Sequence, residues 1–270
     1  MIAAGSRRSW LHRLMAVVGA ATIRSVEELL LSASLAATVL VVAMRRDAWR
    51  RVVWSEQLKV LHEVAIGSLA TTFGAGILVG FTLVSQAIYW LDVTGTTGVV
   101  GPILIVLLIR EFTPILVGLI LFGRSGTATL IELSEARNTG WQHMIERQGL
   151  DPLVVLVLPR AFGFAVGAFC MATVLVLTTL VTGYLLGHAL GLIRFSIWDF
   201  GVLVLRGTSL ADFIVPPLKC LVIGFLVALA TSATALGGEG RQNLRRIVPL
   251  GFVRSAMAIL LANTLIDVVT

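Results

Sequence analysis

The sequence predicts an all-α integral membrane protein, and its composition and residue order both point to that class. The chain of 270 residues is 57% hydrophobic and only 13% charged, with a mean hydropathy of +0.95. A soluble domain is about half apolar and about a quarter charged, so a multi-span protein is the class that fits. The apolar residues form long stretches, and most Arg residues lie between them. No composition change marks off a second domain, so residues 1–270 are expected to form one domain.

Five segments are predicted to span the bilayer as helices. Each reaches the length of about 20 residues that a crossing requires. They occupy most of residues 60–269, which we expect to form a five-span bundle: Val60–Leu91, Val99–Phe122, Leu153–Leu192, Phe213–Leu236 and Pro249–Val269. Glycines at four-residue spacing within the spans permit close helix approach. We favour packing within the chain over a dimer seam for these pairs, which are Gly76 with Gly80, Gly163 with Gly167, and Gly183 with Gly187 and Gly191.

Two adjacent charges stand at the centre of the second predicted span. Arg110 and Glu111 lie within an otherwise apolar stretch, and Pro114 follows them. A charge at mid-depth costs about 2.5–3.5 kcal/mol on insertion scales, so it normally faces protein, an opposite charge or water. We therefore select Arg110, Glu111 and Pro114 as candidates for a substrate path. For Glu111, a structural ion pair with Arg110 or with another helix is the simpler interpretation.

The first 59 residues form a basic N-terminal region. Its apolar stretch Leu29–Met44 has acidic residues before it and Arg residues after it. If this stretch spanned the membrane, two basic clusters would lie on opposite sides, so we favour a helix lying in the membrane interface. The Arg pair in Ser6–Leu11 is reminiscent of a twin-arginine export signal, but no clean apolar region follows it. We expect a retained N-terminus.

The distribution of basic residues predicts the orientation. Lys and Arg are concentrated before Lys59 and in the segments 124–151 and 237–248, whereas the other loops hold only Arg194 and Arg206. Basic loops face the cytoplasm. The N-terminus and these two loops are therefore predicted to be cytoplasmic, in a multi-pass membrane protein.

Residues 124–151 are predicted to form a short amphipathic hairpin on the cytoplasmic side. Gly123 to Gly126 are expected to end the second span, and a helical run follows up to Asn138. Gly140 is expected to be a joint, and Trp141–Gln148 a second short helix. Asp151 and Pro152 suit the start of the next span as a cap and a first-turn residue. Lying on lipid headgroups and docking a cytoplasmic partner explain the hairpin equally well.

The chain lacks the motifs of an enzyme. Its two lysines, Lys59 and Lys219, do not lie in a P-loop, so the chain does not supply its own nucleotide site. The histidines are scattered, no metal-ligand set is recognisable, and no nucleophile elbow occurs. Cys170 and Cys220 both fall in apolar spans and are expected to be buried thiols.

The run R-E-F-T-P-I-L-V-G-L-I-L-F-G-R-S-G-T-A, from Arg110 to Ala128, resembles the signature of the MlaE/YrbE-type permeases. These are the membrane subunits of ABC transporters that work with MCE proteins on lipids. The similarity continues through Glu132-Leu133, Arg137, Asp151-Pro152-Leu153 and Pro159-Arg160. The glycine-containing loop before the last span departs from the family pattern, because it lacks the V-G-x-A-T-T part.

The resemblance implies a permease subunit for phospholipid or another hydrophobic lipid, in a dimer with a second permease chain. It implies a separate P-loop ATPase that holds the ATP and Mg, an MCE-domain lipid-binding partner outside, and no cofactor in this chain. The ATPase would dock on a coupling helix, Ala128–Asn138. The candidate residues for this coupling are Arg124, Leu130, Glu132, Leu133, Glu135 and Arg137.

Two other functions remain open on the sequence. The first is an ion- or proton-coupled carrier that uses Arg110 and Glu111, together with Asn263 and Asp267, as a relay. The second is a membrane scaffold in which the charged pair is only structural. For Asn263 and Asp267, a position near water at the outer end of the last span is the simpler interpretation.

Overall fold

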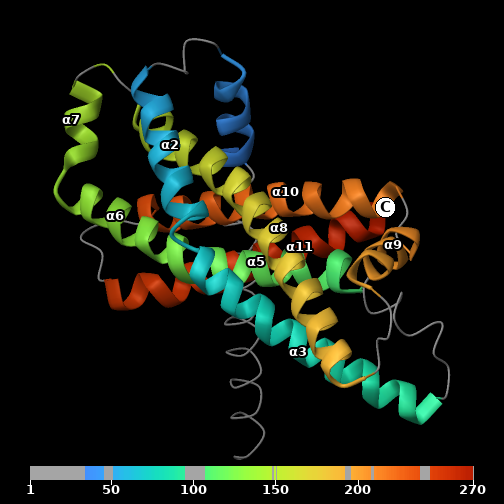
Figure 1. Cartoon of the computed structure of the whole chain (residues 1–270). Coiled ribbons are helices and arrows are strands. Elements are labelled where there is room, and N and C mark those ends of the chain that lie inside the picture. The colour runs from blue at the N-terminus through green and yellow to red at the C-terminus, as the bar shows by residue number, and fades with distance from the viewer. Residues whose placement is uncertain are drawn as a thin grey trace, which may run out of the picture.

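The computed structural model describes residues 34–45, 51–94, 107–147, 149, 151–191, 196–207, 210–237 and 244–269. These residues are helical apart from short turns and ends (Figure 1). The helices are α2 (Arg51–Ala65), α3 (Leu69–Thr94), α5 (Thr113–Leu121), α6 (Thr127–Asn138), α7 (Trp141–Arg147), α8 (Leu158–Ala189), α9 (Ile197–Gly207), α10 (Leu210–Leu236) and α11 (Leu244–Val269). Three π-helical turns precede or join them, namely η2 (Leu108–Phe112), η3 (Phe122–Gly126) and η4 (Leu153–Val157).

Among the described residues, five helical segments are long and apolar enough to cross a membrane, in agreement with the predicted number. They are Val53–Leu83, Leu108–Asn138, Leu153–Ala189, Phe213–Leu236 and Leu244–Val268. The fourth has the predicted bounds. The first and fifth begin earlier than predicted, at Val53 and Leu244, and α3 continues to Thr94, past the predicted end of the first span. Residues 99–106 of the second predicted span and residue 192 of the third lie outside the described residues. The chain is therefore a multi-pass membrane protein.

The first spanning segment bends between α2 and α3. Residues 66–68 form a turn, and Gly67 lies at its centre. A Cβ at Gly67 would collide with the carbonyl oxygen of Glu63. The bend therefore requires a glycine, which has no side chain at this close approach.

The predicted break at Gly123 to Gly126 is wrong. The helical backbone continues from η2 through α5 and η3 into α6, and Gly126 has an ordinary helical φ of −65°. The four residues, two of them glycines, form part of a π-helical turn. In such a turn the backbone hydrogen bonds join residues five apart, and not four apart as in an α-helix. The second span and the amphipathic helix α6 are therefore one continuous rod.

The joint, the second short helix and the cap after α6 agree with the prediction, but α7 turns away from α6 and does not fold back along it as a hairpin would (Figure 1). Gly140 adopts a φ of +73° between α6 and α7, a conformation that favours glycine. Asp151 Oδ1 accepts a hydrogen bond of 2.9 Å from the backbone N–H of Leu153, and Pro152 precedes the π-helical turn η4. Of the second predicted helix, Gln148 lies outside the described residues.

Only part of the predicted interfacial helix Leu29–Met44 is described. Ser34–Ala43 forms a short apolar helix, and its residue Val39 is 2% exposed in the same core cluster as Val53. The helix therefore packs against the bundle. Residues 29–33 lie outside the described part of the chain.

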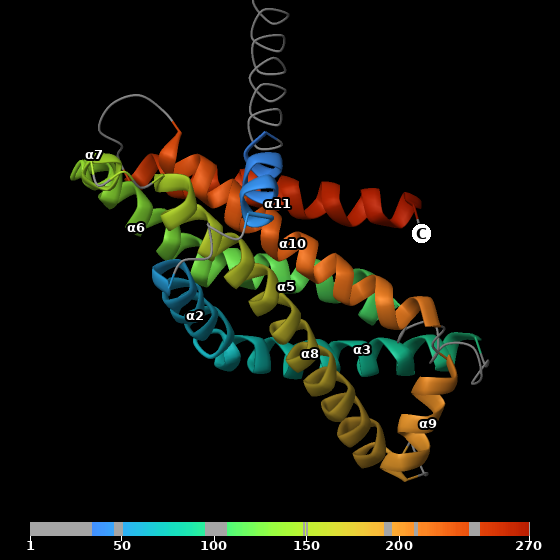
Figure 2. The same ribbon diagram turned by 90° about the horizontal axis from the view of Figure 1, so that it is seen from above.

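Helix α8 is the centre of the bundle. It packs against α2, α3 and α10 (Figure 2). The predicted glycine pairs serve this packing within the chain: Gly76 and Gly80 of α3 meet Thr178 and Thr179 of α8, while Gly163 and Gly167 of α8 meet Val60 and Val64 of α2. Cys220 is buried as predicted, but Cys170 is exposed, because it lies on the face of α8 away from the core.

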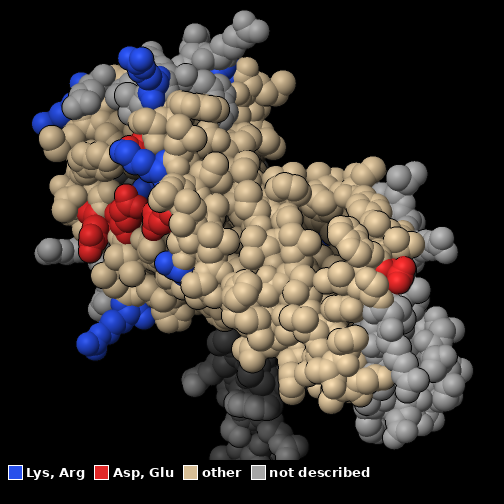
Figure 3. All heavy atoms as spheres, in the orientation of Figure 1, with Lys and Arg blue, Asp and Glu red and all other residues tan. Residues whose placement is uncertain are grey.

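The two ends of the bundle differ in charge. Helices α6 and α7 lie at one end, together with the start of α2, whereas α9 and the C-terminus lie at the other (Figures 1 and 2). On the face shown in Figure 3, nearly all visible Lys, Arg, Asp and Glu side chains gather at the α6–α7 end. Exposed large apolar side chains occur along the spanning helices, for example Phe73, Leu78 and Phe81 of α3, as expected of a surface that faces lipid.

Candidate functional site: a lysine held between two carboxylates

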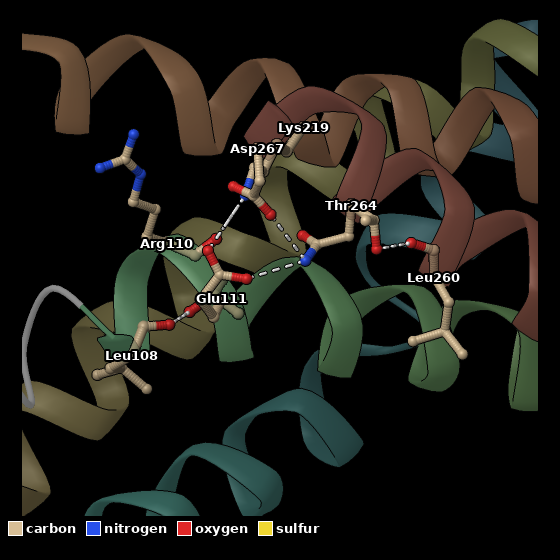
Figure 4. Close-up of polar contacts among 9 residues, drawn as sticks. Leu108, Arg110, Glu111, Lys219, Leu260, Thr264 and Asp267 are labelled. Atoms are coloured by element: carbon tan, nitrogen blue, oxygen red, sulfur yellow. Dashed lines mark hydrogen bonds and ion pairs between the residues drawn. The ribbon is translucent and has the colours of Figure 1, made fainter. Parts of the chain in front are cut away.

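Lys219 of α10 is fully buried, with a relative exposure of 0%. Its Nζ donates a hydrogen bond to Asp267 Oδ1 of α11 and lies 3.5 Å from Glu111 Oε1 of η2. Three separate segments of the chain thus meet at one ammonium group (Figure 4). An ammonium inside an apolar bundle is stable only when it is paired and hydrogen-bonded, and both conditions hold here.

Asn263 joins the two carboxylates from the other side. Its Nδ2 donates to Glu111 Oε2 at 3.0 Å and to Asp267 Oδ2 at 3.2 Å. Asn263 is 6% exposed, and its Oδ1 has no hydrogen-bond partner among the described residues. We call Glu111, Lys219, Asn263 and Asp267 the charged cluster.

Pro114 gives Lys219 a further acceptor. In an α-helix the carbonyl of Arg110 would bond to the N–H of residue 114, but a proline has no N–H. Lys219 Nζ donates to this carbonyl at a distance of 3.1 Å. The π-helical turn η2 lies at the same place, and there the Thr113 hydroxyl donates a hydrogen bond of 2.9 Å to the carbonyl of Leu108. Such turns occur frequently at functional sites.

The Arg110 side chain points away from the Glu111 carboxylate in Figure 4, although its backbone carbonyl accepts a hydrogen bond from Lys219. Glu111 is paired with Lys219 of α10, and pairing with another helix is one of the two structural pairings considered for it. The sequence pattern placed the two opposite charges next to each other, but adjacent helical residues point about 100° apart and do not face each other.

The charged cluster is open on one side. The side chains of Glu111 and Asp267 are 35% and 28% exposed, whereas Lys219 is completely covered. With both carboxylates ionised and Lys219 protonated, these three groups carry a formal charge of −1. The arrangement can therefore hold a proton or attract a cationic group at its open side, as ionisable groups within membrane spans do in transport proteins.

Sequence reasoning missed Lys219 and connected the other members only in part. Asn263 and Asp267 are four residues apart on one face of α11, and Lys219 is the one lysine within a predicted span. These two signals mark Lys219, Asn263 and Asp267 as polar residues within spans, but they do not say which of them meets Glu111. Which helices lie side by side is a tertiary property, so the pairing itself had no signal in the sequence.

Of the six candidate coupling residues, two are buried, three are exposed and one is half-buried. Leu130 and Leu133 of α6 are 0% exposed in a core cluster with Leu156 and Ile247, so they fasten α6 to its own chain. Arg124, Glu132 and Glu135 are exposed.

The remaining coupling candidate, Arg137, turns toward the bundle. Its Nη1 donates hydrogen bonds of 3.0 Å to the carbonyls of both Leu236 and Gly237, at the end of α10. Glu132 forms an ion pair of 2.8 Å with Arg160 of α8, which is almost completely buried. Within the described ranges, no three His, Cys, Asp or Glu side chains gather as a metal site would require.

Comparisons with known proteins agree on one family. The profile of the family described as Permease MlaE matches residues 57–269. A Rickettsia typhi protein named as a probable ABC transporter permease is 23% identical over 206 residues, covering 76% of this chain and 77% of its own length. A permease of the same name from Synechocystis is 24% identical and covers 77% and 78%.

A further relative carries a more specific name. It is the intermembrane phospholipid transport system permease protein MlaE of Haemophilus influenzae, which is 27% identical over 104 residues, or 38% of this chain and 40% of its own length. The family profile covers the first candidate span from residue 57 onward, the other four completely, the charged cluster and α6. The chain belongs to the MlaE permease family.

Proposed function

We propose that this chain is the transmembrane permease subunit of an ABC-type transporter that moves phospholipid or another hydrophobic lipid at the bacterial inner membrane. The observation that carries the proposal is the family match over residues 57–269. The names of the relatives add the ABC transporter class and, for the Haemophilus influenzae protein, phospholipid as cargo.

An ABC permease requires an ATPase from another chain, which would hold the ATP and Mg. Helix α6 is the docking element that we propose for it. It continues the second span without a loop, and its residues Glu132 and Glu135 are exposed. Charged side chains gather at the end of the bundle where α6 and α7 lie (Figures 1 and 3). Arg124 is exposed just before the helix. Exposed charges around a helix whose apolar face is already buried suit a polar, reversible contact.

The charged cluster is the part of the lipid path that we propose within the bundle. A bare ion in contact with lipid tails is costly, so the partly exposed Glu111 and Asp267 are expected to face an internal chamber. A second permease chain would close this chamber, and an MCE-domain protein would receive or deliver the lipid on the outer side. With α6 cytoplasmic, the N-terminus lies inside.

The test is purification of the tagged chain in a gentle detergent from its native host. We expect a P-loop ATPase to copurify, and we expect ATP-dependent transfer of labelled phospholipid after reconstitution of the complex into vesicles. The chain alone should hydrolyse no ATP. Replacing Glu111 with Gln should lower lipid transfer while the ATPase remains bound. Isolation of the chain without any ATPase would contradict the proposal.

The charged cluster also supports a second candidate, an ion- or proton-coupled carrier. A buried lysine between two carboxylates is a chemically reasonable proton-binding site in a membrane. One vesicle assay distinguishes the two candidate functions. A pH gradient without ATP should drive transport by a coupled carrier, whereas it should leave an ABC permease inactive.

A further inference from the structure

We propose that Arg137 is a positioning residue that clamps the end of α10 to α6, so that displacement of α6 reaches the charged cluster. Its role in transport rests on the proposed function, because it assumes that an ATPase moves α6. The clamp itself is a property of the chain. This assignment replaces the sequence-based interpretation of Arg137 as a contact for the ATPase.

The first observation is the pair of bonds made by the guanidinium group. Arg137 Nη1 donates to the carbonyls of Leu236 and Gly237, both at 3.0 Å. The last carbonyls of a helix have no partner within that helix, and a cation near them also interacts favourably with the helix dipole. Arg137 is therefore a C-terminal cap for α10, supplied by a different helix.

The second observation is that α6 holds the other helices of the charged cluster as well. Leu130 of α6 packs so closely on Gly251 of α11 that a Cβ at Gly251 would collide with Leu130 Cδ1. On its N-terminal side α6 continues through η3 into α5 and η2, without an intervening loop. The three segments that supply Glu111, Lys219 and Asp267 are thus each attached to α6: η2 through the continuous helix, α10 through Arg137 and α11 through Leu130.

The separation between α6 and the charged cluster suits a mechanical link. At 1.5 Å per residue, Lys219 lies about 25 Å along α10 from the bonds of Arg137, and Asp267 lies a similar distance along α11 from Gly251. Helices of this length transmit displacement as rigid units when both ends are held. The ion pair of Glu132 with Arg160 gives α6 an additional attachment to α8.

Removal of the clamp gives the first test, which uses the chain alone in detergent. In Arg137→Leu, we expect backbone amide hydrogen exchange in the last turn of α10 to become about tenfold faster, because two charge-assisted bonds are lost. Arg137→Lys keeps a cationic donor and should restore most of the protection. Arg147→Leu removes an exposed arginine from α7 and serves as the matched control, with exchange in α10 unchanged.

The second test measures coupling in the complex with the ATPase. Arg137→Leu should retain the bound ATPase and its ATP hydrolysis, whereas the amount of lipid moved per ATP should fall about tenfold. Arg137→Lys should recover most of this ratio, and Arg147→Leu should match the wild type.

Three results for Arg137→Leu would overturn the inference. The first is unchanged hydrogen exchange in α10, and the second is an unchanged amount of lipid moved per ATP. The third is loss of the bound ATPase while α10 remains protected from exchange. The last result would make Arg137 a docking contact. A wild-type complex that hydrolyses ATP without moving lipid would instead refute the proposed function, and the exchange experiment would still decide whether the clamp exists.

Discussion

Lys219 shows how a single buried charge organises residues from distant parts of the sequence. Its ammonium has the carboxylates of Glu111 and Asp267 and the carbonyl of Arg110 as neighbours. Each of these groups would be costly to bury alone. Together they form a site whose members depend on one another, so the effects of substituting them should not be additive.

Replacing Lys219 with Met tests this dependence. The substitution leaves two carboxylates facing each other without a cation, and breaking a buried ion pair in this way costs about 3 kcal/mol. We expect Lys219→Met to lower the thermal unfolding temperature in detergent, measured by circular dichroism.

The matched control neutralises the partners as well. Lys219→Met combined with Glu111→Gln and Asp267→Asn removes all three charges and should recover most of the lost stability. If Lys219→Met unfolded at the wild-type temperature, the three groups would not form an interdependent site.

At the scale of elements, close helix contacts determine where the charged cluster can form. Gly224 of α10 faces α8, where an added Cβ would lie 2.5 Å from the carbonyl oxygen of Phe164 and 2.8 Å from the Cβ of Ala168. In a membrane, helices associate largely through such close packing of small residues. The position of α10, and with it that of Lys219, therefore depends on the absence of a side chain at Gly224.

A larger residue at this contact should push α10 away from α8. We expect Gly224→Leu to destabilise the bundle by about 1–3 kcal/mol, as overpacking does, and to impair lipid transfer. Gly74→Leu introduces the same side chain into α3, where nothing lies within 4 Å of the added Cβ. Thermal unfolding should separate the two variants, and equal melting temperatures would show that the α8–α10 contact tolerates a side chain.

For the whole molecule, the charge distribution determines orientation. The exposed charges of α6 and α7 gather at one end, and the opposite end carries α9 with the exposed Trp198 (Figures 1 and 3). Basic segments remain in the cytoplasm, while tryptophan favours the membrane interface. The α6–α7 end is thus predicted to face the cytoplasm and α9 the outer side.

Labelling of introduced cysteines tests this orientation. Both native thiols are first removed with Cys170→Ala and Cys220→Ala, and either Trp198→Cys or Glu135→Cys is then added. We expect a membrane-impermeant maleimide to label position 198 in intact spheroplasts, and position 135 only after lysis. The reverse pattern would place α6 outside and exclude docking of a cytoplasmic ATPase there.

Hydrophobicity is a local property, and for this reason the sequence predicted much of the fold. A run of about 20 apolar residues must cross the bilayer whatever its neighbours are, so five spans followed directly from the residue order. Gly140 and Asp151 were also predictable, because a helix end and a helix cap depend only on adjacent residues. The turn at Gly123 to Gly126 was not, since glycine permits a break without requiring one.

The sequence alone predicted a helical chain with five spans, the number of candidate spans found among the described residues, and a charged residue, Glu111, within one of them. The tertiary structure alone decided that Lys219 is the cation beside Glu111, and that Arg137 donates hydrogen bonds to the end of α10. The physical reason is that burial of apolar residues is set by composition along the chain. An ion pair or a cap between two helices depends instead on which faces come together in space.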